Sequence, residues 1–229
     1  MVLTLNGTAG RIASVYGNFA NLTRIMCRAS DGSPNGGGGG KDSAADSSAD
    51  ESADESAARH AILVGLMGCG KSSLGRLLAN RLNLAFRDSD ADIAARAGKS
   101  VARIFAEDGE AAFRAAEREV IPGLLSRAPA AVIALGGGAF TDAETRAECL
   151  RRGTVFWLDA PPRILAERVG TADGRPLLSD GADMTATLAR LLGERAEFYG
   201  EADHRVDVAA GSEEEIVARM AALWEEDAK

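Results

Sequence analysis

The sequence predicts an α/β fold in which a five-stranded, mostly parallel sheet is covered by helices on both faces. Short apolar runs alternate along the chain with longer segments whose apolar residues recur at helical spacing. A glycine-rich loop joins the first apolar run to the first of these helices. The chain has 229 residues, of which 46% are hydrophobic, enough for one domain with a complete core. Strands that alternate with helices in this way build parallel sheets with both faces buried.

The first strand and helix flank the glycine-rich loop Gly65–Ser73. The apolar run Ala61–Val64 before it has the length and composition of a buried strand. The loop matches the pattern G-x-x-x-x-G-K-[ST], in which backbone N–H groups converge on phosphate oxygens, Lys71 reaches the outer phosphates and the Ser72 hydroxyl suits magnesium. The helix that follows points its partly positive N-terminus at the same anion. Because strand, loop and helix come in the order that the motif requires, a nucleotide-phosphate site is favoured over a chance glycine-rich turn.

Composition and cysteine content restrict the compartment and the partners. The formal net charge of -8 argues against general nucleic-acid binding, which needs a basic face. No apolar run of the sequence approaches the ~20 residues of a membrane span. Cys27, Cys69 and Cys149 are too sparse for a disulfide framework and indicate a cytoplasmic protein with reduced thiols. Cys69 lies inside the loop, either as a small tolerated residue or as a redox-sensitive thiol at a helix N-terminus.

Residues 1–58 are expected to lie outside the folded domain. Residues 1–30 contain arginines and no acid, which fits a transit peptide, a disordered leader or a start codon placed too early. Residues 31–58 are rich in Gly, Ser, Ala and acidic residues. They predict a disordered linker, because such a stretch buries too little apolar surface to offset the cost of ordering it. The folded domain is therefore predicted to span residues 59–229.

The second and third strands are each followed by residues suited to a site. Ala85–Arg87 forms a second short strand that leads into Asp88-Ser89-Asp90, where an extended backbone would point both carboxylates the same way. Two short helices and then a long helix over Glu110–Leu125 come next. A third buried strand, Ala130–Leu135, runs into the turn Gly136–Gly138.

The rest of the chain supplies two more strands and their helices. A helix is predicted over Asp142–Arg152, with Thr141 as its N-cap. The remaining elements, in chain order, are a strand over Thr154–Leu158, a helix beginning at Pro161, a mobile Gly-, Asp- and Ser-rich lid at about 171–183, a helix over Met184–Tyr199, a strand over Arg205–Val208 and a helix over Glu213–Glu226.

Acidic and basic residues should gather where these strands end, because ligands of parallel sheets bind beyond the carboxyl ends of the strands. Next to a phosphate site, one of Asp88 and Asp90 can help to hold magnesium while the other accepts a proton from a hydroxyl. Without that neighbour, a solvated acidic turn would be the simpler interpretation. Arg114 either pairs with Glu117 on the helix surface, worth about 0.2–0.5 kcal/mol, or binds a carboxylate with its planar fork of donors.

The combination of motifs resembles shikimate kinase, in the nucleoside-monophosphate-kinase-like group of P-loop folds. The phosphate loop alone is shared by many NTPases, whereas the combination is specific. It extends over roughly residues 60–225 and consists of the loop Gly65–Ser72, Asp88-Ser89-Asp90, Phe113-Arg114-Ala115-Ala116-Glu117 and Gly136–Gly138, together with Arg175-Pro176-Leu177-Leu178 and Glu194-Arg195 before Tyr199. The resemblance implies a three-layer P-loop kinase fold with a small lid. It also implies transfer of the γ-phosphoryl group of ATP to the 3-hydroxyl of shikimate.

The resemblance further implies a role for each site residue. The ATP phosphates would be bound by Gly68, Cys69, Gly70, Lys71, Ser72 and Ser73, with Ser72 ligating one Mg²⁺ ion and Asp88 nearby. Arg168 would stack on the adenine, and Arg175 would close from the lid toward the transferring phosphoryl group. Shikimate would contact Asp90, the candidate base at the 3-hydroxyl, the backbone N–H of Gly137, and Arg114 and Arg195, which grip its carboxylate. The implied catalytic residues are Lys71, Asp90 and Arg175.

One segment departs from the family pattern, and several other functions compete with the one implied. Ala209-Ala210-Gly211-Ser212 lacks the arginine that some members carry beside the adenine, which bears on nucleotide affinity and base preference. A gluconate-type kinase would keep the loop but lack the Arg114–Gly137–Arg195 substrate set. A nucleoside monophosphate kinase would need a base-recognition pocket and often a second arginine-rich lid. A non-catalytic regulator built on this fold would be expected to lose catalytic residues. We therefore expect a monomeric cytoplasmic enzyme that binds ATP and shikimate, and neither nucleic acid nor membrane.

Overall fold

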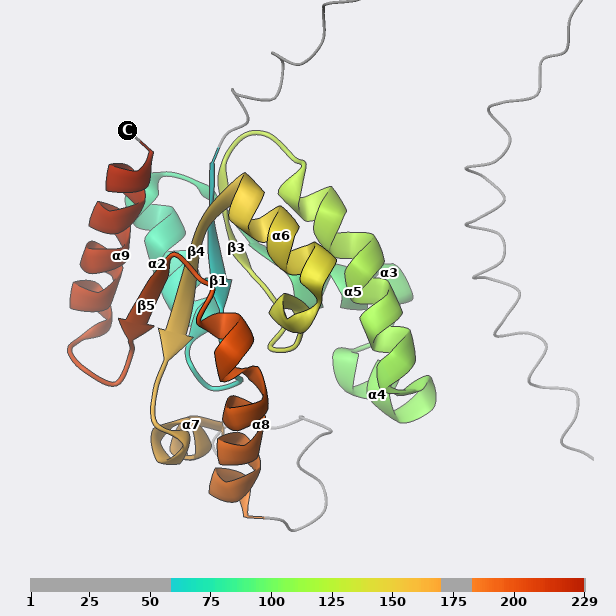
Figure 1. Ribbon diagram of the computed structural model, residues 1–229. Helices are drawn as coiled ribbons and strands as arrows, with labels where there is room; N and C mark the ends of the chain where they lie inside the picture. Colours follow the sequence, from blue (N-terminus) through green and yellow to red (C-terminus); the bar gives the residue numbers. More distant parts are fainter. Residues whose placement is uncertain (1–58, 170–182, 229) are drawn as a thin grey trace, which may run out of the picture. The chain divides into compact units, whose positions relative to one another are not determined.

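The computed structural model describes residues 59–169 and 183–228, and these residues have the predicted α/β architecture (Figure 1). Five strands form one parallel sheet in the order β2-β3-β1-β4-β5. They are β1 (His60–Val64), β2 (Ala85–Asp88), β3 (Ala131–Ala134), β4 (Gly153–Asp159) and β5 (His204–Asp207). All five predicted strands are present, and their ends lie within about one residue of the prediction, the usual uncertainty of such boundaries.

Helices cover both faces of this sheet, which confirms the three-layer arrangement. Figure 1 shows α2 and α9 on one side of the strands and α5 and α6 on the other. The helices are α2 (Lys71–Leu82), α3 (Ser89–Ala97), α4 (Val101–Glu107), α5 (Gly109–Leu125), α6 (Ala143–Arg152), α7 (Pro162–Val169), α8 (Met184–Tyr199) and α9 (Glu213–Asp227), with the short 3₁₀ helix η2 (Ala139–Thr141). In the described parts of the chain, no helix has both the length and the hydrophobicity of a membrane span.

The core is densest around the central strands. Every residue of β1 and β3 is buried, as expected for inner strands of a parallel sheet that is packed on both faces. Ile62 of β1 is in register with Ile133 of β3 on one side and with Val155 of β4 on the other. Ile62, Ile133 and Val155 therefore lie side by side on the three central strands of the sheet.

A buried histidine ties the start of β1 to the segment between α5 and β3. The Nδ1 atom of His60 accepts the Ala131 N–H at 3.0 Å, so the ring proton lies on Nε2, which contacts the Leu125 carbonyl at 2.9 Å. Burial lowers the pKa of His60 from its ordinary value of 6.5. Only the neutral ring can make both contacts, because the imidazolium has no acceptor nitrogen.

The start of α3 corrects the prediction for Asp88 and Asp90. The Asp88 carboxylate accepts the Asp90 N–H at 3.1 Å and caps the helix, which therefore begins at Ser89. The sequence predicted that the two acids share one extended segment, and this prediction was wrong. Asp88 ends β2, whereas Asp90 lies in the first turn of α3, so the two carboxylates are presented by different elements.

The predicted N-cap of α6 was also wrong. Asp142, not Thr141, caps this helix, because its carboxylate accepts the Thr145 N–H at 3.0 Å. Thr141 ends η2, and its hydroxyl donates to the Gly138 carbonyl at 2.7 Å. The hydroxyl of Thr141 therefore stabilises the glycine turn after β3 rather than the helix.

Three predicted segments fall wholly or largely outside the described residues. These are the leader over residues 1–30, the linker over 31–58, and the lid at about 171–183 with Arg175. Asp183, at the end of the lid segment, is described, and its carboxylate accepts the Thr185 N–H at 2.9 Å to cap α8. The lid segment is thus bounded by α7 before it and α8 after it.

Candidate active site

A cavity of about 710 Å³ lies where the sheet strands end and is lined by segments far apart in the sequence. This position at the carboxyl edge is the one expected for a parallel α/β sheet. Of the predicted site residues, those that line the cavity are Gly68, Cys69, Gly70, Lys71, Ser72, Ser73, Asp88, Asp90, Arg114, Gly137, Arg168 and Arg195. The remaining one, Arg175, lies outside the described residues.

The phosphate loop has the backbone geometry that its glycines allow. Gly70 has φ 90° and serves as the N-cap of α2, which places the helix N-terminus at the cavity. Gly68 has φ 80°, and a Cβ atom there would lie 2.9 Å from the Leu165 carbonyl of α7. Lys71 is the first residue of α2, and its Nζ atom donates to the Gly65 carbonyl at 2.9 Å. The lysine ammonium therefore lies against the loop, at the edge of the cavity.

Two side chains at the phosphate loop carry oxygen atoms that could ligate a metal ion. The Ser72 hydroxyl of α2 donates to the Asp88 carboxylate of β2 at 2.8 Å, and both residues line the cavity. A hydroxyl and a carboxylate are hard donors of the kind that Mg²⁺ prefers, and the ion usually completes its shell with water and phosphate oxygens. The residues present thus fit a magnesium ion that is bound together with a nucleotide.

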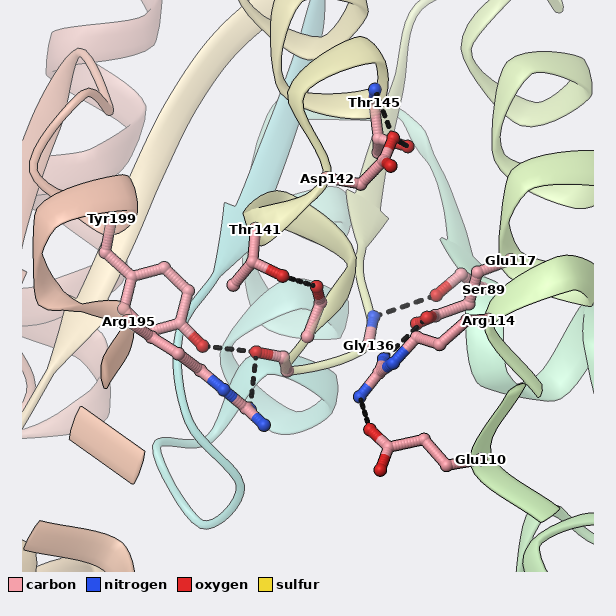
Figure 2. Close-up of polar contacts among 12 residues, drawn as sticks. Ser89, Glu110, Arg114, Glu117, Gly136, Thr141, Asp142, Thr145, Arg195 and Tyr199 are labelled. Carbon is pink, nitrogen blue, oxygen red and sulfur yellow. Dashed lines mark hydrogen bonds and ion pairs between the residues drawn. The ribbon is translucent and has the colours of Figure 1, made fainter. Parts of the chain in front are cut away.

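Arg114 of α5 is held by two carboxylates, as Figure 2 shows. Its guanidinium bonds Glu117 at 2.6 Å and Glu110 at 2.9 Å. The side chain of Glu117 is only 4% exposed and that of Arg114 is 24% exposed, so this is not the surface pair that one interpretation of the sequence supposed. The second carboxylate oxygen of Glu117 is buried and makes no hydrogen bond to any described residue.

Burial and the charge of the partner act in opposite directions on the pKa values of Arg114 and Glu117. Burial raises the pKa of Glu117, and the guanidinium of Arg114 works against that rise. Burial also works to lower the pKa of Arg114, but the adjacent Glu117 carboxylate outweighs it and the net pKa is raised. Arg114 therefore stays cationic and is oriented from behind, while it still lines the cavity.

The glycine turn after β3 lets side chains of α3 and α5 lie close to its backbone. A Cβ atom on Gly136 would lie 2.5 Å from Oε1 of Glu117 and 2.8 Å from Oδ1 of Asp90. A Cβ atom on Gly138 would collide with the guanidinium of Arg114. Both positions must therefore be glycine for Asp90 and Arg114 to stay where they are.

A second arginine reaches the same turn from α8. Arg195 donates through Nη1 to the Gly137 carbonyl at 2.9 Å and lines the cavity. The turn Gly136–Gly138 thus has Arg114 against its last residue and Arg195 on its middle residue. Two guanidinium groups on different helices are suited to bind one small anion between them.

The cavity is also lined by part of the segment that departs from the family pattern. Arg168 donates to the Val208 carbonyl at 3.0 Å, and both residues line the cavity with Gly211 and Ile216. Arg168 therefore lies beside the segment 209–212. Cys69 is fully buried, which fits its interpretation as a small packing residue.

Three side chains at the site had no predicted role in the chemistry: Ser89, Glu117 and Tyr199. The buried Ser89 hydroxyl accepts the Gly136 N–H at 2.9 Å and fixes the start of the glycine turn. Tyr199 donates its hydroxyl to the Gly137 carbonyl. For Glu117 and Tyr199 the spacing along the chain offers a signal. Glu117 follows Arg114, and Tyr199 follows Arg195, by about one helical turn, which places each beside a predicted site arginine. For Ser89 the sequence offers no such signal.

The fold and the site together define a P-loop phosphotransferase with an anion-binding pocket beside the phosphate loop. The family model described as "Shikimate kinase" matches residues 67–224. The chain therefore belongs to the shikimate kinase family.

Relatives and solved structures agree with this assignment. The chain is 48% identical over 166 residues to a shikimate kinase of Caulobacter vibrioides, covering 72% of this chain and 81% of the relative. It is 46% identical over 162 residues to a shikimate kinase of Paramagnetospirillum magneticum, covering 71% and 82%. The structure of shikimate kinase from Acinetobacter baumannii in complex with shikimate superposes with a TM-score of 0.70 at 33% identity, covering 74% of this chain and 94% of that one. That of Aquifex aeolicus gives 0.63 at 34% identity, with 74% and 98% covered.

Proposed function

We propose that the protein transfers the γ-phosphoryl group of ATP to the 3-hydroxyl of shikimate. The observation that carries this proposal is that one cavity contains a phosphate loop together with Asp90, Arg114 and Arg195. A phosphoryl donor and a small acidic acceptor can therefore meet in one space. The family membership and the shikimate-bound neighbour support the same acceptor.

The acceptor would lie against the glycine turn. Arg114 and Arg195 would bind the shikimate carboxylate, because a guanidinium presents paired donors that match a carboxylate. Asp90 would contact the 3-hydroxyl. As that oxygen bonds to the γ-phosphorus, the bond from phosphorus to the ADP oxygen breaks, and Asp90 accepts the hydroxyl proton.

The donor would lie along the phosphate loop. The backbone N–H groups of Gly68–Ser73 and the ammonium of Lys71 would bind the phosphates, with Arg168 beside the adenine. Arg175 would reach the transferring group from the predicted lid. Phosphoryl transfer depends mainly on in-line positioning and on neutralising the equatorial oxygens, and these groups supply positive charge from different sides.

One Mg²⁺ ion would bind with ATP at Ser72 and Asp88. Their hydrogen-bonded oxygens, 2.8 Å apart, are the hard donors that adjoin the loop. When bound, the ion supplies charge neutralisation at the phosphate oxygens. The protein itself would contribute the side-chain oxygens of Ser72 and Asp88 as ligands.

We also propose that the enzyme is a cytoplasmic monomer whose folded domain spans residues 59–229. The phosphate loop, Asp90 and both arginines of one chain line the same cavity, which supports a site built within a single copy. The composition of residues 31–58 supports a boundary near residue 59. Light scattering of the purified protein tests the first point, and a mass near twice 23.8 kDa would contradict it.

A coupled assay of ADP release tests the proposed reaction. The enzyme would be given ATP and Mg²⁺ with shikimate, gluconate or AMP as the acceptor. We expect kcat/KM for shikimate to exceed that for the other two acceptors by about 10³-fold or more, the scale of discrimination when a site is built to pair with its substrate's polar groups. Lys71→Ala, purified in parallel, controls for contaminating kinases. Equal or better turnover of gluconate or AMP would overturn the proposed acceptor.

A further inference from the structure

Two side chains of α8 donate to one backbone oxygen in the acceptor half of the cavity. Figure 2 shows the side chains of Arg195 and Tyr199 ending at the same carbonyl, that of Gly137. Arg195 and Tyr199 lie one turn apart on the same face of the helix. The glycine turn is therefore attached to α8 at two points.

Tyr199 is built into the core rather than into the cavity. Its side chain is fully buried, and its ring lies against Trp157 of β4 with a centroid distance of 5.8 Å. Burial raises the pKa of Tyr199 to about 12, so the phenol keeps its proton and can act as a donor throughout the physiological range. Because core packing holds the ring, the position of the Tyr199 hydroxyl does not depend on a bound ligand.

Arg195, in contrast, is only partly buried and lines the cavity. Its guanidinium has five N–H donors, so one bond to Gly137 orients the plane and leaves other donors for a ligand. The orientation of the guanidinium therefore depends on how firmly the Gly137 carbonyl is held in position. The turn also lies near the phosphate loop, since a Cβ atom on Gly137 would be 3.4 Å from the Gly65 carbonyl.

We propose that Tyr199 is a positioning residue for the acceptor: its hydroxyl fixes the Gly137 carbonyl and, through it, the guanidinium of Arg195. This inference rests on the proposed function, in which Arg195 binds the substrate carboxylate. Without the hydroxyl, the turn and the guanidinium would have to be ordered by the substrate itself. Part of the binding energy would then be used for ordering, which weakens acceptor binding more than the chemical step.

Tyr199→Phe tests this role, because it removes the hydroxyl and keeps the packed ring. We expect KM for shikimate to rise by about three- to tenfold, the scale of one net hydrogen bond, while KM for ATP changes less than twofold. Calorimetric titration with shikimate alone should show a rise in Kd of the same size. Val155→Ala, in the buried first half of β4 and away from the cavity edge, is the matched control. It should lower Tm without changing the ratio of the two KM values.

A double-mutant cycle shows whether Tyr199 acts through Arg195. Tyr199→Phe should raise KM for shikimate clearly less in an Arg195→Ala background than in the parent enzyme. Fully independent effects, an unchanged KM in Tyr199→Phe, or an equal rise in both KM values would each overturn the inference. If the parent enzyme phosphorylates shikimate and Tyr199→Phe matches it, only the inference fails. If the parent enzyme does not phosphorylate shikimate, the proposed function fails and the inference fails with it.

Discussion

Replacement of Arg114 should reveal whether this side chain recognises the acceptor carboxylate. The comparison uses Arg114→Ala, Arg114→Lys and the parent enzyme, each measured with shikimate and with its carboxamide analogue. A charge-assisted hydrogen bond is worth about 1.5–3 kcal/mol, so Arg114→Ala should raise KM for shikimate by about ten- to a hundredfold. KM for ATP should remain almost unchanged. Arg114→Lys should recover only part of the loss, because an ammonium does not reproduce the planar fork.

The structure also predicts a cost in stability, which has to be separated from the effect on binding. Arg114→Ala removes the hydrogen-bonded cation from the buried Glu117 carboxylate, and breaking a buried pair of this kind costs up to about 3–5 kcal/mol. The cost should be smaller here, because Arg114 is 24% exposed and the pKa of Glu117 is already raised. Arg114→Lys keeps a cation beside Glu117, so its Tm should lie closer to that of the parent enzyme.

The ratio of acid to amide binding decides the question, because a general loss of stability affects both ligands alike. The parent enzyme should prefer the acid strongly, and Arg114→Ala should prefer it much less. Calorimetric titration of both ligands into both enzymes gives the four dissociation constants. Equal ratios for the two enzymes would refute the assignment, and carboxylate recognition would then depend on Arg195 alone.

The remaining predictions concern the phosphate loop, the N-terminal segment and the response to pH. Lys71→Ala should lower kcat by about 10²–10³-fold with little change in Tm, and near-normal turnover would contradict the phosphate-loop assignment. Deletion of residues 1–58 should leave Tm and kcat/KM unchanged, and a large fall in Tm would show that the segment packs on the domain. His60 has a lowered pKa, so the unfolded chain binds more protons than the folded one as the pH falls below 6.5, and stability is lost there. His60→Gln should weaken this pH dependence in thermal unfolding measurements, because the amide can still accept and donate at any pH; an identical pH profile would exclude His60 as its source.

Local patterns predicted the fold because each one depends on residues close together in the chain. The apolar run before Gly65, the glycine loop and the following helix form one continuous unit, and the structure places its strand, β1, at the centre of the sheet. The alternation of strands and helices likewise predicted a parallel sheet, and all four strand pairings in the structure are parallel. Helix starts were less predictable, since Asp88 and Asp142 each compete with neighbouring residues for the same cap.

The gathering of distant segments at one edge of the sheet was predicted, whereas the individual hydrogen bonds between them could not be. Nothing local indicates that the carboxylate of Glu117 is buried against Gly136, or that Tyr199 on α8 reaches the Gly137 carbonyl. His60 similarly makes its hydrogen bonds only because β1, β3 and the end of α5 pack together. These contacts follow from the three-dimensional packing of elements, which residue spacing along the chain does not encode.

Identification of the phosphorylated product tests the proposed reaction most directly. The full-length protein would be incubated with ATP, Mg²⁺ and shikimate, and the products followed by phosphorus NMR. We expect one ADP for each new phosphate monoester, with the ester on the 3-hydroxyl, and product formation about 10²–10³-fold slower with Lys71→Ala. Release of ADP with inorganic phosphate only, or an ester at a different hydroxyl, would contradict the proposed reaction.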